Sequence, residues 1–368
     1  EELARDRFII GDSVFVKGSP VLSRLGSISL SEWKTEGRSF VWAMALKGIK
    51  EKPLLGWGQD NFNYVFAEHY SAKMFNLEPW FDRAHNIFLD WGVSGGLLGL
   101  GAYLSLYVVL LMAIWTKSRD HSFAERSVLT GLLAAYFFNN VFVFDNLVSY
   151  VLFIALLAEF GVRHDQVGES LKEGEVPMVS SVVIPILVLS AIYYVNLNPL
   201  IANTDLIKAL KTSQASGDGH LAAIGYFKDA YNRSRLGRPE TVEWISSSAQ
   251  GILSDNQVSM EARNDFFIFA VSAMESMTTN LKADPRYEMV AGAFYLATGQ
   301  LDQAEAHFNR AKLLMPEKQQ IYFQLGQVLY YKKDYQAALE AFKQAYELAP
   351  EYDQAKMIYQ EALKQIPH

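Results

Sequence analysis

The sequence feature that most constrains this chain is a run without any charged residue from Gly92 to Ile114, flanked by Trp91 and Trp115. At about 1.5 Å per residue, a helix of this length crosses the roughly 30 Å hydrocarbon layer of a membrane. Tryptophans at both ends are typical of the aromatic belts at the two membrane surfaces. We therefore predict a membrane-spanning helix here.

Glycines are unusually frequent at the start of this run. Four of them form two overlapping pairs with small-xxx-small spacing: Gly92, Gly95, Gly96 and Gly99. Because such pairs let two helix backbones come close, we expect a neighbouring helix to pack on this face.

The distribution of hydrophobic residues is more informative than their total. They make up 50% of the chain but concentrate between Trp91 and Leu200, whereas the last third is typical of a soluble helical protein. The absence of cysteine excludes disulfides and thiolate metal sites. The net charge of −7, without a basic stripe, argues against nucleic-acid binding.

A second apolar stretch, residues 127–162, follows a connector that contains Lys117, Arg119 and Arg126. The positive charge of the connector predicts a cytoplasmic position. The stretch is broken at NNVFVFDN, and each half is short for a full span. It is therefore either a hairpin of two thin spans or a re-entrant pair.

A last span is predicted at Met178–Leu197, with a kink at Pro185, after a cytoplasmic linker at 163–177. If 127–162 crosses the membrane an even number of times, residues 1–90 and everything after about 200 lie on the extracytoplasmic side. An odd number of crossings would instead place the tail in the cytoplasm.

These spans divide the chain into parts. We predict an extracytoplasmic loop at 1–90, transmembrane helices at 91–162, a linker at 163–177, a transmembrane helix at 178–200 and a soluble helical domain at 204–368. The chain begins EELARDRFII, without an initiator methionine or a signal sequence, so we expect further membrane helices upstream in a longer protein.

The segment before the first span predicts two short helices joined by a turn. One helix is predicted to begin near Arg38, because the apolar residues that follow share a helical face. Pro53 ends it. Gly56 and Gly58 then allow a tight turn, before a second helix around Tyr64–Tyr70.

The soluble domain contains a repeat with a period of 34 residues, at 285–318 and 319–352. The aligned pairs are Gly292 and Gly326, Ala304 and Ala338, Phe308 and Phe342, Ala311 and Ala345, and Pro316 and Pro350. These positions resemble those of tetratricopeptide repeats. One or two degenerate repeats are expected between 204 and 284, because a single unit cannot bury its own face. The predicted fold class is all-α: a polytopic transmembrane region followed by an α-solenoid.

Three motifs around the first span resemble the O-antigen ligase and polymerase family of polytopic membrane proteins. They are Arg38 four residues before Trp42, the KPLLGWGQDNF turn and the AHNIFLDWGVSGGLLG passage, and the resemblance covers about residues 36–162. It implies transfer of a glycan from a polyprenyl-diphosphate donor to a lipid, a growing polysaccharide or a protein side chain.

A diphosphate leaving group requires a fixed cation where negative charge develops. Arg38 suits this role, since a guanidinium binds phosphate oxygens through two parallel hydrogen bonds. The alternative for Arg38 is a surface arginine paired with Glu36 or a lipid headgroup. Arg83 is the second diphosphate-binding candidate, with an interfacial arginine as its alternative.

His85 is the candidate general base for the acceptor hydroxyl, because a histidine pKa lies near the working pH. Together with Asn86 it occupies the His-Asn position that the resemblance implies. The alternative is a histidine that caps the span or bonds to Asp82 or Asp90. Asn86 is a supporting candidate or a loop-stabilising residue, and Asp145 either orients a catalytic group or forms a turn.

No metal or cofactor is predicted. His69, Asp82, His85 and Asp90 lie close in sequence, but no pair has the spacing of a recognised zinc motif. The chain has neither a Gly-x-Ser-x-Gly elbow nor a phosphate-binding P-loop.

The leading hypothesis is a metal-independent glycosyltransferase in the bacterial inner membrane, with the loop and the repeats outside the cytoplasm. The repeats would dock a protein partner or the glycan. The alternative is a non-catalytic, membrane-anchored scaffold that recruits extracytoplasmic proteins. A transporter is disfavoured, because the spans contain almost no buried charge for coupling.

Overall fold

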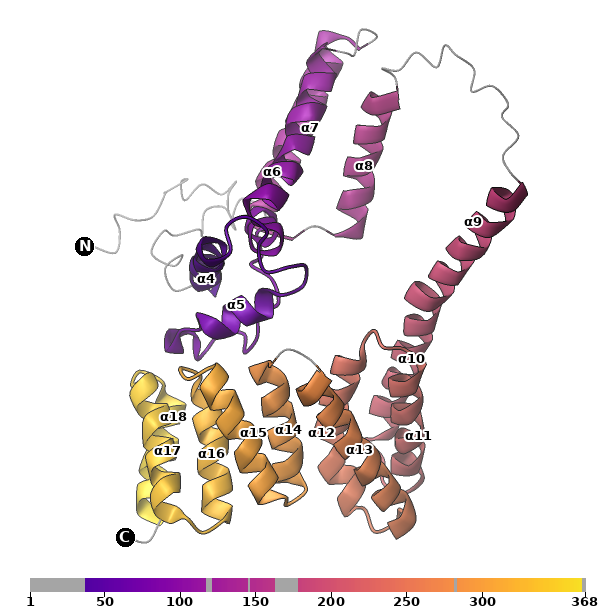
Figure 1. The fold of residues 1–368 in the computed structure, drawn as a ribbon. Coiled ribbons are helices and arrows are strands. Elements are labelled where there is room, and N and C mark those ends of the chain that lie inside the picture. Colours follow the sequence, from indigo (N-terminus) through magenta and orange to yellow (C-terminus); the bar gives the residue numbers. More distant parts are fainter. Residues whose placement is uncertain (1–36, 117–120, 145, 163–177, 281–282, 366–368) are drawn as a thin grey trace, which may run out of the picture. The chain divides into compact units, whose positions relative to one another are not determined.

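The computed structural model describes residues 37–116, 121–144, 146–162, 178–280 and 283–365, and Asp145 lies outside them. Within these ranges every regular element is a helix, in agreement with the predicted all-α class (Figure 1). The chain divides into two compact units, residues 1–168 and 169–368.

The first unit contains the predicted span. Its helices are α4 (Gly37–Glu51), α5 (Phe62–Glu68), the 3-10 turn η2 (Ala72–Met74), α6 (Ile87–Thr116), α7 (Phe123–Asn140) and α8 (Leu147–Val162). Helix α6 includes the whole uncharged run and is long and apolar enough to cross a membrane. Helix α4 lies where the apolar face after Arg38 predicted it, and it ends at Glu51, ahead of Pro53.

Helices α7 and α8 account for the broken apolar stretch. Near the start of α7, the ring of His121 lies 5.6 Å from the ring of Phe160, near the end of α8. At the loop between them, Phe142 lies 6.2 Å from Trp42 of α4. The pair therefore runs from the connector end of α6 to the α4 end and back, a course that a hairpin of two spans and a re-entrant pair share.

Helix α6 is interrupted at Gly96, which has φ 62° and ψ −161°. The loop from Pro53 to Gly58 fills the interruption and takes up the backbone groups that the break leaves without helical partners. Four backbone hydrogen bonds join loop and helix: Trp57 N–H to Val93 O (2.7 Å), Gly58 N–H to Ser94 O (2.9 Å), Leu97 N–H to Pro53 O (2.7 Å) and Leu98 N–H to Leu54 O (3.4 Å).

Two glycines, Gly96 of α6 and Gly56 of the loop, allow this close contact, which the glycine spacing in α6 did not predict. A side chain at Gly96 would overlap the backbone of Leu54, and one at Gly56 would overlap the backbone of Val93, so both glycines permit loop and helix to touch. Gly92 does face a neighbouring helix, because a β-carbon there would lie 2.6 Å from Ile49 of α4.

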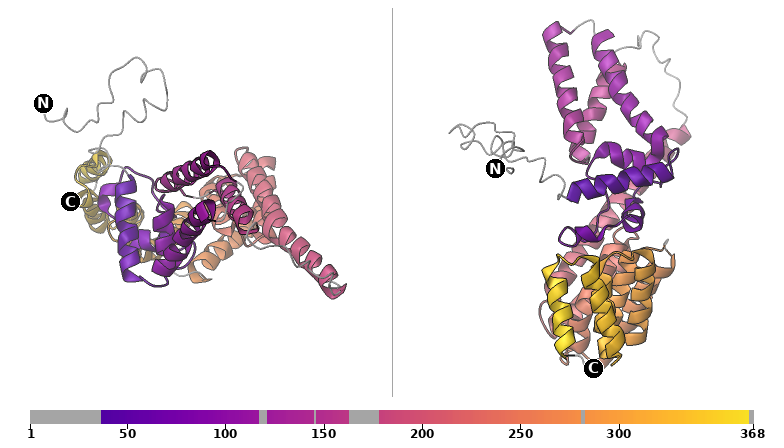
Figure 2. Two further views of the ribbon diagram at one scale, coloured as in Figure 1. Left: turned by 90° about the horizontal axis from the view of Figure 1, so that it is seen from above. Right: turned by 90° about the vertical axis from the view of Figure 1, so that its left-hand side faces the viewer.

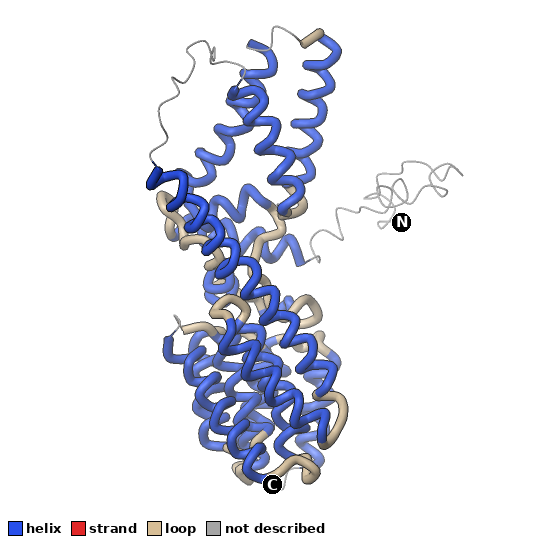
Figure 3. The backbone as a smooth tube through the Cα atoms, turned by 90° about the vertical axis from the view of Figure 1, so that its right-hand side faces the viewer, coloured by secondary structure: helices blue, strands red, loops and turns tan. Residues whose placement is uncertain are grey.

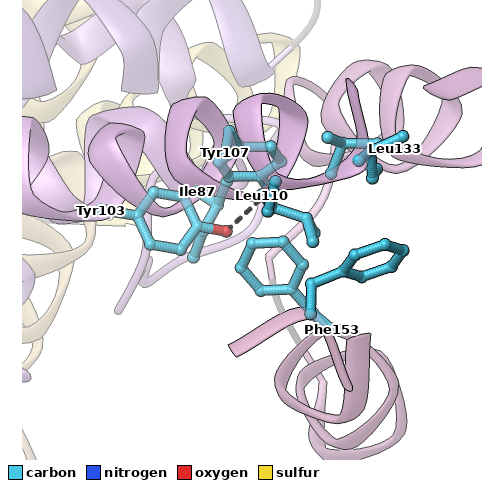
Figure 4. Packing of buried hydrophobic residues seen from close by; sticks show 9 residues of the cluster. Ile87, Tyr103, Tyr107, Leu110, Leu133 and Phe153 are labelled. Atoms are coloured by element: carbon cyan, nitrogen blue, oxygen red, sulfur yellow. Dashed lines mark hydrogen bonds between the residues drawn. The ribbon is translucent and has the colours of Figure 1, made fainter. Parts of the chain in front are cut away.

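An aromatic core joins α6, α7 and α8 (Figure 4). The hydroxyls of Tyr103 and Tyr107 lie 3.1 Å apart, and the Asn140 amide donates to both, at 3.2 and 3.0 Å. The three side chains are nearly fully buried, so their mutual hydrogen bonds offset the cost of placing polar groups among apolar ones. The apolar members of the cluster include Ile87, Leu110, Leu133 and Phe153.

The second unit begins with a long helix. Helix α9 (Met178–Ala191), the π-helical segment η3 (Ile192–Leu197) and α10 (Asn198–Thr212) follow one another without a loop, and Figure 3 draws them as one continuous helix. The part from Val182 to Thr212 is also long and apolar enough to cross a membrane. The helix continues through Pro185 and past the domain boundary that we predicted between 200 and 204.

The remaining helices form a solenoid, shown side by side in Figure 2. They are α11 (Asp218–Arg233), α12 (Arg238–Ser254), α13 (Met260–Asn280), α14 (Pro285–Ala297), α15 (Leu301–Leu314), α16 (Gln319–Tyr331), α17 (Tyr335–Leu348) and α18 (Asp353–Gln365). Helix α10 pairs with α11, α14 with α15, and α16 with α17. The helix predicted as the last span thus continues directly into the first helix of the solenoid.

The repeat positions meet inside each helix pair. Phe308 lies over Gly292, where a β-carbon would come within 2.6 Å of its ring, and Phe342 lies over Gly326 in the same way. Ala304 is fully buried beside them. The period of 34 residues therefore reflects a recurring contact between an aromatic ring and a bare backbone.

Candidate functional site

The candidate residues lie where the segment before α6 meets the loop between α7 and α8. Asn86 closes the N-terminus of α6, because its side-chain oxygen accepts hydrogen bonds from the backbone amides of Phe88 (3.0 Å) and Leu89 (3.1 Å). This is an N-cap, and the side chain is buried. Of the two readings of Asn86, its geometry fits the structural one.

His85 has a backbone conformation that is uncommon for a residue with a side chain, with φ 54°. Its half-buried ring meets Phe81 and Phe144 edge-on, at centroid distances of 5.8 and 5.4 Å. Asp90 is not its hydrogen-bond partner: Asp90 Oδ1 accepts from the backbone amide of Ala84, at 2.7 Å. Strained residues that the surrounding structure holds in place cluster at functional sites, so His85 stays a candidate.

Arg83 shares the same aromatic neighbour. Its guanidinium lies 5.4 Å from the centroid of the Phe144 ring, so Phe144 contacts both Arg83 and His85. We did not predict Phe144 from the sequence. The available signal was an aromatic residue inside the NNVFVFDN break, next to Asp145. Asp145 itself lies outside the described residues.

Arg38 lies in the first turn of α4 and is exposed. Gly37 beside it packs against Phe81, which in turn contacts His85. Trp42, one turn later, contacts Phe142 of the loop between α7 and α8. Arg38 is therefore carried by a helix that shares one aromatic neighbour, Phe81, with His85.

A cavity of about 350 Å³ lies beside these residues. Its walls come from the loop after Gly58, from the start of α6 and from the start of α8. Among the described residues, its lining includes Arg83 but neither Arg38 nor His85. The polar lining residues are Gln59, Asp60, Asp82, Arg83, Asp90, Ser94 and Asn146.

The loop that fills the break in α6 also shapes this cavity. The Trp57 indole donates to the Gly48 carbonyl at 2.9 Å, and Lys52 lies 3.7 Å from the centroid of its ring. Asp60 follows with φ 57°, a second side chain held in the left-handed region. Trp57 thereby fixes the course of the chain from which Gln59 and Asp60 reach the cavity.

The cavity combines three carboxylates, one guanidinium and several amide or hydroxyl groups with the aromatic walls of Phe62, Trp91 and Tyr150. Such a lining can hydrogen-bond hydroxyl groups and hold one negative group at Arg83. In the part of the chain that the structure describes, no three His, Asp or Glu side chains gather as a metal site. His69, one of the residues considered for a metal, lies 2.8 Å from a carboxylate oxygen of Glu51 instead.

Comparison with known families agrees with both resemblances. Residues 13–104 match the family described as O-antigen ligase, and residues 288–351 match the tetratricopeptide repeat. The chain combines a segment that is similar to the O-antigen ligase family with tetratricopeptide repeats. The ligase match begins earlier and ends earlier than the 36–162 that we assigned from motifs, and it includes Arg38, Arg83 and His85. No curated protein matches the chain.

Proposed function

We propose that the chain belongs to an integral membrane glycosyltransferase, which transfers a glycan from a polyprenyl-diphosphate donor to a lipid, polysaccharide or protein acceptor. The observation that carries this proposal is the contact of Arg83 and His85 with one aromatic ring, Phe144, beside a polar cavity at the start of an apolar helix. The ligase-family match over these residues supports it.

The donor requires a cation near the membrane surface. Arg83 fits this role best, because it lines the cavity and contacts the Phe144 ring, which also contacts His85. Arg38 remains a second diphosphate-binding candidate at the first turn of α4, where the helix dipole also favours an anion. A guanidinium at either position would stabilise the negative charge that develops on the leaving diphosphate.

The transfer step needs one base and one leaving group. In our proposal His85 takes the proton of the acceptor hydroxyl, whose oxygen attacks the anomeric carbon of the donor sugar. The bond from that carbon to the diphosphate oxygen breaks, and polyprenyl diphosphate leaves with the bonding electrons. Histidine suits this step because it exchanges a proton near neutral pH.

The course of the helices supports a location outside the cytoplasm for the site. The first turn of α7 carries Arg126, and ring contacts of Trp115 with Phe123 and of His121 with Phe160 place the ends of α6 and α8 at that same side of the first unit. If α6, α7, α8 and α9 each cross the membrane, the segment before α6 and the solenoid face the same, extracytoplasmic side. We propose a multi-pass protein of the bacterial inner membrane on this basis.

The test is the glycan made by cells that carry single variants of the full-length protein at equal membrane levels. We expect His85→Ala and Arg83→Ala to reduce the transferred glycan at least about hundredfold, in line with the loss of a proton-transfer or charge-stabilising group. Arg38→Ala is expected to reduce it less. Lys47→Ala, which removes an exposed cation of α4, is the matched control.

Normal transfer in both His85→Ala and Arg83→Ala would contradict the catalytic proposal. It would favour the membrane-anchored scaffold, in which the solenoid recruits a protein and the segment before α6 only packs. Deletion of 213–368 separates the two roles further, because it removes the solenoid after α10 and none of the candidate site residues.

A further inference from the structure

A pocket of about 260 Å³ lies in the solenoid, between α16, α17 and α18. Its described lining residues all belong to the solenoid. Its lining includes Gln327, Tyr330 and Tyr331 of α16, Phe342 of α17, and Glu361 and Gln365 of α18.

The pocket exists because two equivalent aromatic residues are covered differently. Phe308, in the earlier repeat, is fully buried under the following helix pair. Phe342, its counterpart one repeat later, is only half-buried, because α18 packs on α17 as a single helix within the described residues. Phe342 is one of the residues that line the pocket.

The polar groups of the pocket suit an uncharged ligand. No lysine or arginine is among its described lining residues. The one carboxylate among them, Glu361, accepts a hydrogen bond from Gln365 at 2.6 Å, and water screens its 3.5 Å pair with the exposed Lys364 ammonium, so Glu361 disfavours an anionic ligand. The amides of Gln327 and Gln365 each offer donors and an acceptor.

The apolar groups of the pocket are flat and exposed. Tyr330 is 38% exposed and Tyr331 is 53% exposed, and their rings meet at 65° with centroids 6.1 Å apart. Exposed tyrosines combine an apolar face with a hydroxyl that can hydrogen-bond. A ligand with one apolar face and a rim of hydroxyls fits this combination, and a pyranose ring has that form.

We propose that this pocket binds a neutral sugar residue of a glycan chain, with the ring on Tyr331 and the hydroxyls on Gln327 and Gln365. The choice of a sugar over a neutral peptide rests in part on the proposed function, since a glycosyltransferase handles a polymer that a second site can hold. The solenoid would then retain the acceptor or the product near the membrane between transfer steps.

The test is the binding of neutral hexasaccharides of glucose and of N-acetylglucosamine to the full-length protein in lipid nanodiscs, measured by calorimetry. A hexamer of galacturonic acid and a neutral, Gln/Ser-rich hexapeptide are compared in parallel. We expect at least one neutral hexasaccharide to bind with a millimolar or tighter Kd, and the acidic hexamer to bind at least about tenfold more weakly because Glu361 lies in the pocket.

Two variants and two controls locate the binding. Tyr331→Ala and Gln327→Ala should each weaken it at least about tenfold, by removing a ring face or an amide. Tyr359→Ala and Gln344→Ala, which change the same residue types on α18 and α17 outside the pocket, should leave it unchanged. Circular dichroism confirms that each variant keeps its helix content.

Three results would overturn the inference: no binding of any neutral hexasaccharide up to about 10 mM, tighter binding of the hexapeptide, or binding unaffected by Tyr331→Ala. The outcome is separable from that of the proposed transfer reaction. Loss of sugar binding in Tyr331→Ala together with normal transfer in His85→Ala would keep the pocket and reject the catalytic role. Loss of transfer in His85→Ala without any sugar binding would do the reverse.

Discussion

The solenoid and the candidate site are both helical, but they are held together by contacts of different range. In the solenoid, the defining contact of Phe308 with Gly292 lies within one repeat and recurs 34 residues later at Phe342 and Gly326. At the site, each defining contact occurs once and joins distant segments, as with Trp57 and Val93 or Phe144 and His85.

This difference has an energetic consequence. A repeated local contact distributes stability over many similar units, so that the loss of one weakens its neighbours only through their shared interface. A contact made once, by backbone groups in an apolar setting, has no replacement. The predictions below test whether the two regions respond to substitution in these two ways.

The largest effect is expected at the break in α6. Gly96→Val puts a side chain into the backbone of Leu54 at a φ of 62°, where strain adds to overlap. The backbone strain and the steric overlap each cost about 1–3 kcal/mol of stability. We expect the first unit to lose its folded state and the cells to lose glycan transfer, measured by thermal unfolding in detergent and by glycan analysis.

The control for this prediction is Gly101→Val, in the same helix, where a β-carbon meets no atom within 4 Å. It should retain both folding and transfer. Equal behaviour of the two valine variants would show that the loop and the broken helix tolerate separation, and the contrast with the solenoid would disappear.

The second effect concerns the aromatic residue between the two candidate groups. Phe144→Ala removes the ring that contacts both Arg83 and His85, and leaves both of these residues in place. Positioning of reacting groups contributes strongly to rate, so we expect transfer to fall about tenfold to hundredfold. Phe144→Tyr should restore most of the activity, because it keeps the ring.

A merely structural role for Phe144 would give a different pattern. Phe138→Ala, which removes an exposed ring of α7 that contacts Phe142, is the matched control. If Phe144→Ala and Phe138→Ala lower activity and thermal stability in the same proportion, Phe144 does not position the catalytic groups.

The third effect is a pH dependence inside the solenoid. Lys318 is 2% exposed, and burial lowers its pKa from 10.5 to about 8. The unfolded chain therefore binds more protons than the folded chain between pH 8 and 10.5, so the free energy of unfolding rises with pH over this window. Over the whole window, this pKa shift of Lys318 changes the free energy of unfolding by about 3 kcal/mol.

Urea unfolding of the full chain, followed by circular dichroism at pH 8, 9 and 10, measures this rise. Lys318→Met removes the titrating group and should abolish the pH dependence that belongs to it. A wild-type stability that stays constant or falls from pH 8 to pH 10 would contradict the prediction.

The smallest effect distinguishes the two repeats from each other. Gly292→Ala forces a methyl group against Phe308, which is fully buried and cannot move aside, and should cost about 1–3 kcal/mol of stability. Gly326→Ala meets Phe342, which is only half-buried and can shift toward the pocket. We expect its cost to be smaller by about 1 kcal/mol or more, measured by the same urea unfolding. Equal costs would mean that the pocket does not relieve the contact.

Much of the architecture could be predicted because the sequence signals are periodic. The uncharged run gave the position of α6, the apolar face after Arg38 gave α4, and the 34-residue period gave the helix pairs from α14 to α17. Each of these signals depends on neighbours along the chain. Residue spacing is therefore sufficient to identify them.

The details of the site could not be predicted in this way. Gly96 has the same spacing whether it packs against a helix or interrupts one, and only the loop from Pro53 decides between the two. Asn86 caps a helix at a position where sequence also allows a catalytic neighbour. Phe144 carried no motif, because its importance comes from a contact with residues about 60 positions away.

The uninterrupted helix from Met178 to Thr212 has a consequence for rotational phase. Each residue turns an α-helix by about 100°, so the number of residues between span and solenoid sets the azimuth at which the repeats leave the membrane. The π-helical segment at Ile192–Leu197 shifts that phase, because its hydrogen bonds enclose one more residue than those of an α-helix. Deletion of a single residue there would swing the pocket beside Tyr331 around the axis of the span by about a quarter of a turn, while leaving every repeat intact.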